Sequence, residues 1–166
     1  EQAYPSVITA TNDPRVYPFG ALLRRTKVDE LPQLYNVLRG DMAIVGPRPE
    51  DPRMVERFYA PLHHETLRVP PGLTSPGSIY AYTHGEAELD ARDSERCYGE
   101  RLLPLKLALD IVYLRRASLA YDLALIGRTA WMLGTALLGR REFPLPPELE
   151  DARRIMNERG AARMTA

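Results

Sequence analysis

The sequence predicts an α-dominated α+β domain, in which amphipathic helices are combined with short strands and proline-rich loops. Apolar residues recur with a helical period through most of the second half of the chain. In the first half, prolines and glycines divide the chain into short segments, few of which are long enough for a helix. The length of 166 residues suits one domain with a modest core and is too short to expect two.

The first well-defined helix is expected after a proline-containing stretch. Residues 1–20 contain three prolines and show no helical periodicity, so we expect a loop with short extended pieces there. Further on, Asp29 can cap a helix, Pro32 then falls in its first turn, and Gly40 marks its end. One face of this helix is apolar and consists of Leu31, Leu34, Tyr35 and Leu38.

A strand, a stiff turn and a second helix are expected next. The apolar run Met42–Val45 is too short for a helix before Gly46 and is interpreted as a buried strand. The turn over residues 46–49 holds Arg48 between two prolines. A helix is then expected over residues 51–59, with Met54, Val55 and Phe58 facing inward. The remaining predictions for this half are a loop over 69–77, a short strand over 78–82 and a charged, solvated helix over 86–100.

Two long helices are expected to dominate the second half of the chain. Residues 102–116 are apolar nearly all round, apart from a narrow polar stripe of Lys106, Asp110 and Tyr113. Ser118 is a plausible N-cap for a helix over residues 119–138. We therefore expect residues 1–142 to form the domain, and residues 143–166 to form an extended linker and a weakly helical, charged tail.

Charge and cysteine content limit the classes of function. Lysine and arginine together number 22, as do aspartate and glutamate, which argues against a general nucleic-acid binder. The single cysteine, Cys97, cannot form an internal disulfide and fits a reducing compartment. No run of about twenty apolar residues without charges is present, so an independent transmembrane helix is not predicted. The chain does not begin with methionine, and an N-terminal truncation is expected.

A local basic excess favours contact with a membrane surface. Residues 101–141 carry many more basic than acidic side chains and are also the most apolar part of the chain. The helix over 119–138 contains Trp131, a residue type enriched at membrane interfaces. The alternative is that this helix is a buried hairpin partner of residues 102–116. The charge pattern favours a small, membrane-associated domain.

Charged residues concentrate between positions 24 and 50 and are the candidate site. Arginine binds phosphate in a bidentate way, which makes Arg25, Arg39 and Arg48 candidate phosphate ligands. The supporting candidates are Asp29, Glu30 and Asp41, the last as a possible Mg²⁺ ligand.

Each of these candidates also has a simpler interpretation. For Asp29 and Glu30 the start of a helix is the favoured explanation, because the macrodipole there stabilises carboxylates. Arg48 could be a solvated turn residue instead of a phosphate ligand. His63, His64 and His84 lack a convincing metal-ligand spacing. No nucleophile elbow, P-loop, dinucleotide-binding fingerprint or HExxH motif is present.

The block over residues 23–50, LRRTKVDELPQLYNVLRGDMAIVGPRPE, resembles the signature of the bacterial sugar transferase family, the monotopic phosphoglycosyl transferases. Asn12-Asp13-Pro14-Arg15 resembles the family's entry into this block, and Pro71-Gly72-Leu73-Thr74 resembles its second proline-glycine motif. Asp110, Tyr113, Ser118, Leu119 and Asp122 resemble a later pattern. The resemblance covers residues 12–139.

This resemblance implies an Mg²⁺-dependent enzyme at the cytoplasmic face of the bacterial inner membrane. Such an enzyme moves a sugar phosphate from a UDP-sugar to undecaprenyl phosphate, and so initiates synthesis of an exopolysaccharide, capsule, O-antigen or glycoprotein glycan. In the family, an aspartate of an Asp-Glu dyad is the nucleophile, as suits attack of a carboxylate on phosphorus. That dyad lies upstream of the block above and is expected before Glu1, so it is not Asp29-Glu30.

The chain departs from the family pattern at its second motif, where Pro70 precedes Pro71 and Ser75-Pro76-Gly77-Ser78 follows. Because the nucleophile is expected upstream, this chain alone is expected to be inactive. Two alternatives to a transferase therefore remain: a non-catalytic module that binds a nucleotide-sugar or an anionic lipid, and a structural domain at the membrane surface.

Overall fold

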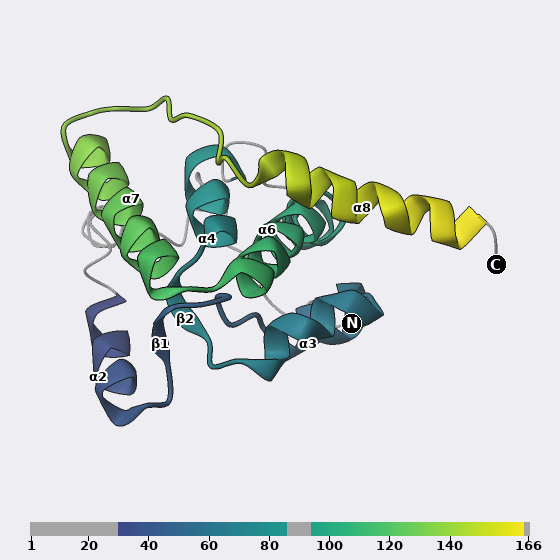
Figure 1. The fold of residues 1–166 in the computed structure, drawn as a ribbon, viewed down its shortest axis with the longest axis horizontal. Helices are drawn as coiled ribbons and strands as arrows, with labels where there is room; N and C mark the ends of the chain where they lie inside the picture. Colours follow the sequence, from purple (N-terminus) through teal and green to yellow (C-terminus); the bar gives the residue numbers. More distant parts are fainter. Residues whose placement is uncertain (1–29, 86–93, 165–166) are drawn as a thin grey trace, which may run out of the picture.

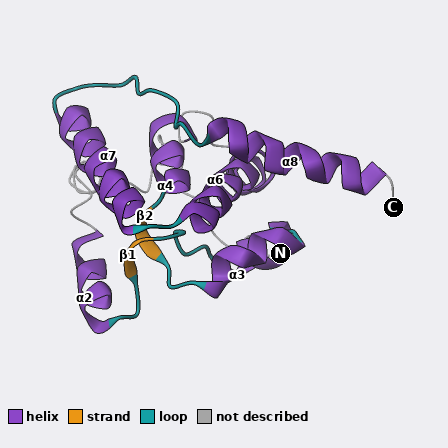
Figure 2. Cartoon of the chain, in the orientation of Figure 1, coloured by secondary structure: helices purple, strands orange, loops and turns teal. Residues whose placement is uncertain are grey.

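The computed structural model describes residues 30–85 and 94–164, and this part of the chain is mostly helical, with a small two-stranded parallel sheet (Figures 1 and 2). The α+β prediction is thereby confirmed. None of the described helices is long and apolar enough to cross a membrane. The elements up to the middle of the chain are α2 (Leu31–Arg39), β1 (Ala43–Val45), α3 (Pro52–Phe58), a 3₁₀ helix (Pro61–Arg68), β2 (Gly72–Thr74) and α4 (Pro76–Tyr80). These are followed by a π-helical turn (Ala81–Gly85), α5 (Ser94–Cys97), a second π-helical turn (Tyr98–Leu102), α6 (Leu103–Arg116), α7 (Leu119–Leu137) and α8 (Leu149–Met164).

The sheet corrects two of the sequence predictions. Strand β1 lies where a strand was predicted and pairs in parallel with β2, with Ala43 opposite Gly72 and Val45 opposite Thr74. The loop predicted over residues 69–77 was therefore wrong at β2. The strand predicted over 78–82 was also wrong, because Ser75 accepts a hydrogen bond from the Ser78 amide and starts α4 there. Strand pairing between segments so far apart in sequence leaves little local signal.

Helix α2 has the predicted end but a different start. Gly40 has a positive φ of 82° and ends the helix, as expected from its freedom to adopt left-handed conformations. The N-cap is Glu30, whose side chain makes no capping hydrogen bond, whereas Asp29 lies outside the described residues. The predicted apolar face is exposed to solvent at Leu31, Leu34, Tyr35 and Leu38.

Helix α6 forms the centre of the core, as Figure 1 shows. Its residues Leu107, Leu109 and Ile111 are essentially inaccessible to solvent, which explains why its sequence is apolar on every side. Helix α8, which was predicted only as a weak charged tail, lies along α6 and buries Ala152 against it. The tail is thus part of the core packing.

Helix α7 is divided into a buried face and an exposed face. Ser118 caps it as predicted, by accepting a hydrogen bond from the Tyr121 amide. Leu125 and Met132 pack into a cluster with residues of the sheet, α4 and α6. The opposite face leaves large apolar side chains exposed, namely Leu119, Leu123, Trp131 and Leu137. The helix is therefore packed on the core along one face only, and it is not a fully buried partner of α6.

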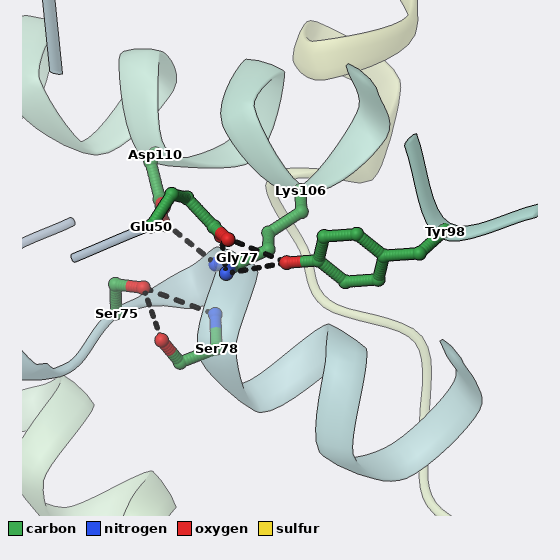
Figure 3. Close-up of polar contacts among 7 residues, drawn as sticks. All are labelled: Glu50, Ser75, Gly77, Ser78, Tyr98, Lys106 and Asp110. Carbon is green, nitrogen blue, oxygen red and sulfur yellow. Dashed lines mark hydrogen bonds and ion pairs between the residues drawn. The ribbon is translucent and has the colours of Figure 1, made fainter. Parts of the chain in front are cut away.

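Helices α4 and α6 approach each other most closely at Gly77. The Gly77 amide donates a hydrogen bond of 2.9 Å to Oδ1 of Asp110, a fully buried carboxylate on α6 (Figure 3). A Cβ atom at Gly77 would lie 2.6 Å from that oxygen and would also clash with the Lys106 carbonyl oxygen. Glycine is thus required here by the close approach of the two helices.

Burial raises the pKa of the Asp110 carboxyl to about 6, against an ordinary value of 3.8. Lys106, Ser75 and the Gly77 amide lower this pKa and only partly offset the effect of burial. The second carboxyl oxygen, Oδ2, has no hydrogen-bond partner among the described residues. Asp110 is therefore a carboxyl group whose ionisation opposes folding.

We predict that Gly77→Ala destabilises the protein by about 1–3 kcal/mol, because the added methyl group must separate α4 from α6. Urea unfolding followed by circular dichroism measures this change. Gly134→Ala is the matched control, since a Cβ there meets nothing within 4 Å on α7. The control should be neutral or stabilising, by up to about 1 kcal/mol. Equal stability of the two variants would contradict the close approach.

We predict a pH-dependent contribution to stability from Asp110. Its pKa is raised on folding, so its contribution to stability is fully present below pH 3.8 and is lost as the pH rises to about 6. This contribution amounts to about 3 kcal/mol for a shift from the ordinary pKa to the folded one. The measurement is the free energy of unfolding of wild type minus that of Asp110→Asn, from pH 3.5 to 7.

That difference should fall with rising pH. The control is Asp41→Asn, which removes an exposed carboxylate. It shows how much of the pH dependence of the unfolding free energy comes merely from the loss of one negative charge. A difference between wild type and Asp110→Asn that stays flat across this range would refute the prediction.

Candidate functional site

A pocket of about 490 Å³ opens between α2, the sheet, α4, α6 and α7. Most of its lining is apolar, with Leu31 and Leu34 from α2 and Ile126 and Leu133 from α7. Its charged side chains are Glu30, Arg48 and Lys106. A concave, largely apolar pocket with few polar groups is the usual form of a small-molecule site.

Arg48 lies in the wall of this pocket and is paired with Glu30. Its Nη2 atom donates to Oε1 of Glu30 at 2.8 Å, and its Nη1 atom donates to Oε2 at 3.1 Å, so the pair is bidentate. Both side chains are partly buried, with 31% and 16% of their surface exposed. Arg48 is therefore not a freely solvated turn residue. A guanidinium has five N–H groups, and among the described residues only Glu30 accepts hydrogen bonds from those of Arg48.

The backbone next to Arg48 is fixed by the sheet. The Gly46 amide donates to the Thr74 carbonyl oxygen and the Gly72 amide donates to the Pro47 carbonyl oxygen, each at 2.9 Å. Gly46 and Gly72 pack so closely that a Cβ atom at Gly72 would overlap the backbone of Gly46. The turn thus continues the pairing of β1 with β2 and projects Arg48 from a defined position.

The other predicted site residues do not join this pair. Arg39 and Asp41 form an ion pair of 3.1 Å with both side chains more than half exposed, and neither lines the pocket. Arg25 and Asp29 lie outside the described residues. The structure therefore brings together Glu30 and Arg48, and it leaves Arg39 and Asp41 on the surface near the end of α2.

A buried cluster of Glu50, Tyr98 and Lys106 was missed by sequence reasoning (Figure 3). The Lys106 ammonium forms an ion pair with Oε1 of Glu50, and the two side chains are only 5% and 7% exposed. Tyr98 donates its hydroxyl hydrogen to the same oxygen at 2.8 Å and accepts from Lys106 at 3.1 Å. The available signal was the polar stripe on α6, since Lys106 lies on a helix that is otherwise apolar.

The Lys106 ammonium keeps its charge although it is buried. Burial by itself lowers the pKa of Lys106, but Tyr98 and Glu50 beside the ammonium raise it by more, so the net shift is upward. Burial is also the main reason why the pKa of Tyr98 lies well above its ordinary value. Lys106 therefore remains a cation and Tyr98 a neutral donor at neutral pH.

His63 and His84 make contacts within the fold. His63 is buried, and its Nδ1 atom accepts a hydrogen bond from the Ala60 amide at the start of the 3₁₀ helix. His84 stacks on Tyr80 with ring centroids 5.2 Å apart. Within residues 30–85 and 94–164, no group of three or more histidine, cysteine or acidic side chains could hold a metal ion.

Comparison with known proteins identifies relatives of the chain. It is 53% identical over 60 residues to a putative undecaprenyl-phosphate N-acetylgalactosaminyl 1-phosphate transferase of Bacillus subtilis, covering 36% of this chain and 34% of the relative. It is 39% identical over 122 residues to an undecaprenyl-phosphate glucose phosphotransferase of Komagataeibacter xylinus, covering 69% and 20%. It is 34% identical over 120 residues to the exopolysaccharide production protein PSS of Rhizobium leguminosarum, covering 69% and 54%.

The chain thus spans less than two thirds of the length of each of these relatives. A family model described as bacterial sugar transferase matches residues 1–136, which include both the Arg48 turn and the Lys106 cluster. With most of its length matched in this way, the chain belongs to the bacterial sugar transferase family.

Proposed function

We propose that the protein containing this chain transfers a sugar 1-phosphate from a UDP-sugar to undecaprenyl phosphate, and that the chain is a portion of its catalytic domain. Support comes from the family and from relatives whose names specify such transfers. The observation that carries the proposal is Arg48, a partly buried cation in the wall of an otherwise largely apolar pocket, with N–H groups that no described residue engages.

Arg48 has the properties that a phosphoryl-transfer site needs. Its guanidinium can hold a phosphate oxygen through N–H groups that are not directed at Glu30, and its positive charge offsets the charge that develops during transfer. Glu30 keeps the guanidinium in one orientation, which reduces the entropy lost on binding. The apolar side chains of α2 and α7 in the same pocket suit contact with an isoprenoid chain.

The nucleophile and Mg²⁺ are expected from the family resemblance. The nucleophilic aspartate is expected upstream of Glu1, where its carboxylate would attack phosphorus and release UMP. We also propose that transfer depends on Mg²⁺. We assign no step to the metal here.

We further propose that α7 contacts the cytoplasmic face of the bacterial inner membrane. Its exposed face presents Leu119, Leu123 and Trp131 to solvent. Arginine pairs stand close to both of its ends, at positions 115–116 before it and 140–141 after it. Apolar side chains flanked by arginines fit a surface of anionic lipid headgroups.

We predict that the full-length protein releases UMP from a UDP-sugar over repeated turnovers only when both a polyprenyl phosphate and Mg²⁺ are present, because the acceptor must remove the sugar phosphate from the nucleophile before another turnover begins. Arg48→Ala should lower kcat/KM by about 100-fold, the loss typical of removing one charge-stabilising donor. An assay of UMP release, with circular dichroism to confirm folding, measures both effects.

The matched variant is Arg39→Ala, which removes an exposed guanidinium outside the pocket and should retain activity near that of wild type. A comparable loss of kcat/KM in Arg39→Ala and Arg48→Ala would support Arg39 as a phosphate ligand after all. Release of UMP over repeated turnovers without acceptor, or any release without Mg²⁺, would contradict the proposed reaction. Ligand binding without any turnover would support a binding module instead.

We predict that anionic vesicles shift the fluorescence emission of Trp131, the single tryptophan, to shorter wavelengths, because α7 enters the lipid interface. The double variant Leu119→Glu, Leu123→Glu should abolish the shift. Leu67→Glu, at another exposed leucine outside α7, is the control and should preserve it. An unchanged emission spectrum with anionic vesicles at low salt would rule out this contact.

A further inference from the structure

We propose that Lys106 is a positioning residue for Arg48: through Glu50 it fixes the turn that carries Arg48 into the pocket. The inference rests on the proposed function of Arg48 as a phosphate ligand. It extends that function to a buried side chain on α6, far from Arg48 in the sequence.

The first step concerns the short connection between Glu50 and Arg48. Only Pro49 separates them, and Pro47 precedes Arg48, so the backbone torsions on both sides are restricted. A displacement of Glu50 is therefore transmitted to Arg48 and is not absorbed by the intervening chain. The restricted backbone of residues 47–50 thus couples the position of Arg48 to that of Glu50.

The second step concerns what holds Glu50. Its carboxylate is buried and receives hydrogen bonds from the Lys106 ammonium and the Tyr98 hydroxyl. Removal of the ammonium would leave a buried carboxylate without a cation, a situation that strongly disfavours the buried position. Glu50 would then turn towards water and take the chain next to Arg48 with it.

The third step is that the other end of the turn is already fixed. Gly46 and Pro47 are hydrogen-bonded to β2, so the turn is held by the sheet at its start and by α6 at its end. Immediately after Glu50, Asp51 caps α3 by accepting a hydrogen bond from the Arg53 amide. Lys106 therefore holds Glu50 at the end of the turn that the sheet does not hold, where α3 begins.

A double-mutant cycle in the full-length protein tests this inference. Lys106→Met keeps much of the side-chain length and removes the charge, and we expect it to lower kcat/KM for UMP release by about 10-fold, within the range of couplings between linked residues. In the Arg48→Ala background, the same substitution should lower kcat/KM by less than about 2-fold, because the residue it positions is already absent. A general loss of structure would reduce activity in both backgrounds.

Tyr98→Phe provides a milder second variant should Lys106→Met fail to fold. It keeps the ring and removes the hydroxyl, and we expect a loss of about 3-fold that disappears in the Arg48→Ala background. The control is Tyr121→Phe, which also removes a tyrosine–glutamate hydrogen bond, here to Glu148, but has no link to the turn. It should leave kcat/KM unchanged in both backgrounds.

The outcomes separate this inference from the proposed function. Multiplicative losses for Lys106→Met and Arg48→Ala would overturn the inference alone, because Lys106 would then act independently, for instance by direct contact with a ligand. Wild-type turnover in Arg48→Ala would overturn the proposed role of Arg48 and the inference with it. A loss that depends on the presence of Arg48 would support both.

Discussion

The buried ion pair between Glu50 and Lys106 is the interaction on which the arrangement of the pocket depends. It joins the segment after the sheet to α6, and both charges are almost completely withdrawn from water. Such a pair adds little net stability compared with apolar packing, but the loss of one partner is costly. Its effect is therefore to allow one position of the Glu50 segment and to exclude others.

Helices packed closely around α6 keep this ion pair buried. Helix α4 can approach α6 because Gly77 has no side chain, and α8 closes another side of α6 with Ala152. The same approach places the Asp110 carboxyl in the interior, where burial raises its pKa. Lys106 and Asp110 are thus held on one buried stripe of α6. The ammonium is paired with Glu50, and Oδ2 of Asp110 has no hydrogen-bond partner among the described residues.

The pocket combines this fixed polar framework with apolar surface. Arg48 and Lys106 lie in its wall, each paired with a glutamate, while α2 and α7 contribute leucines and isoleucine. A substrate with a phosphate group and a long isoprenoid chain has the same division into charged and apolar parts. The chain's family membership and the lining of its pocket therefore both support the proposed transfer of a sugar phosphate to a polyprenyl phosphate.

The sequence by itself determined the elements that local chemistry specifies. These include the end of α2 at Gly40, the strand before Gly46, the cap of α7 at Ser118 and the stiffness of the Arg48 turn. Only the tertiary structure decided which strands pair with each other and which charged side chains form buried ion pairs. The pairing of β1 with β2 joins segments about thirty residues apart, and the pair of Glu50 with Lys106 spans 56 residues. Periodicity and capping report on neighbours along the chain, whereas a buried ion pair depends on which elements pack together. The sequence therefore indicated Arg48 as a site residue, but not the pairing of Lys106 with Glu50.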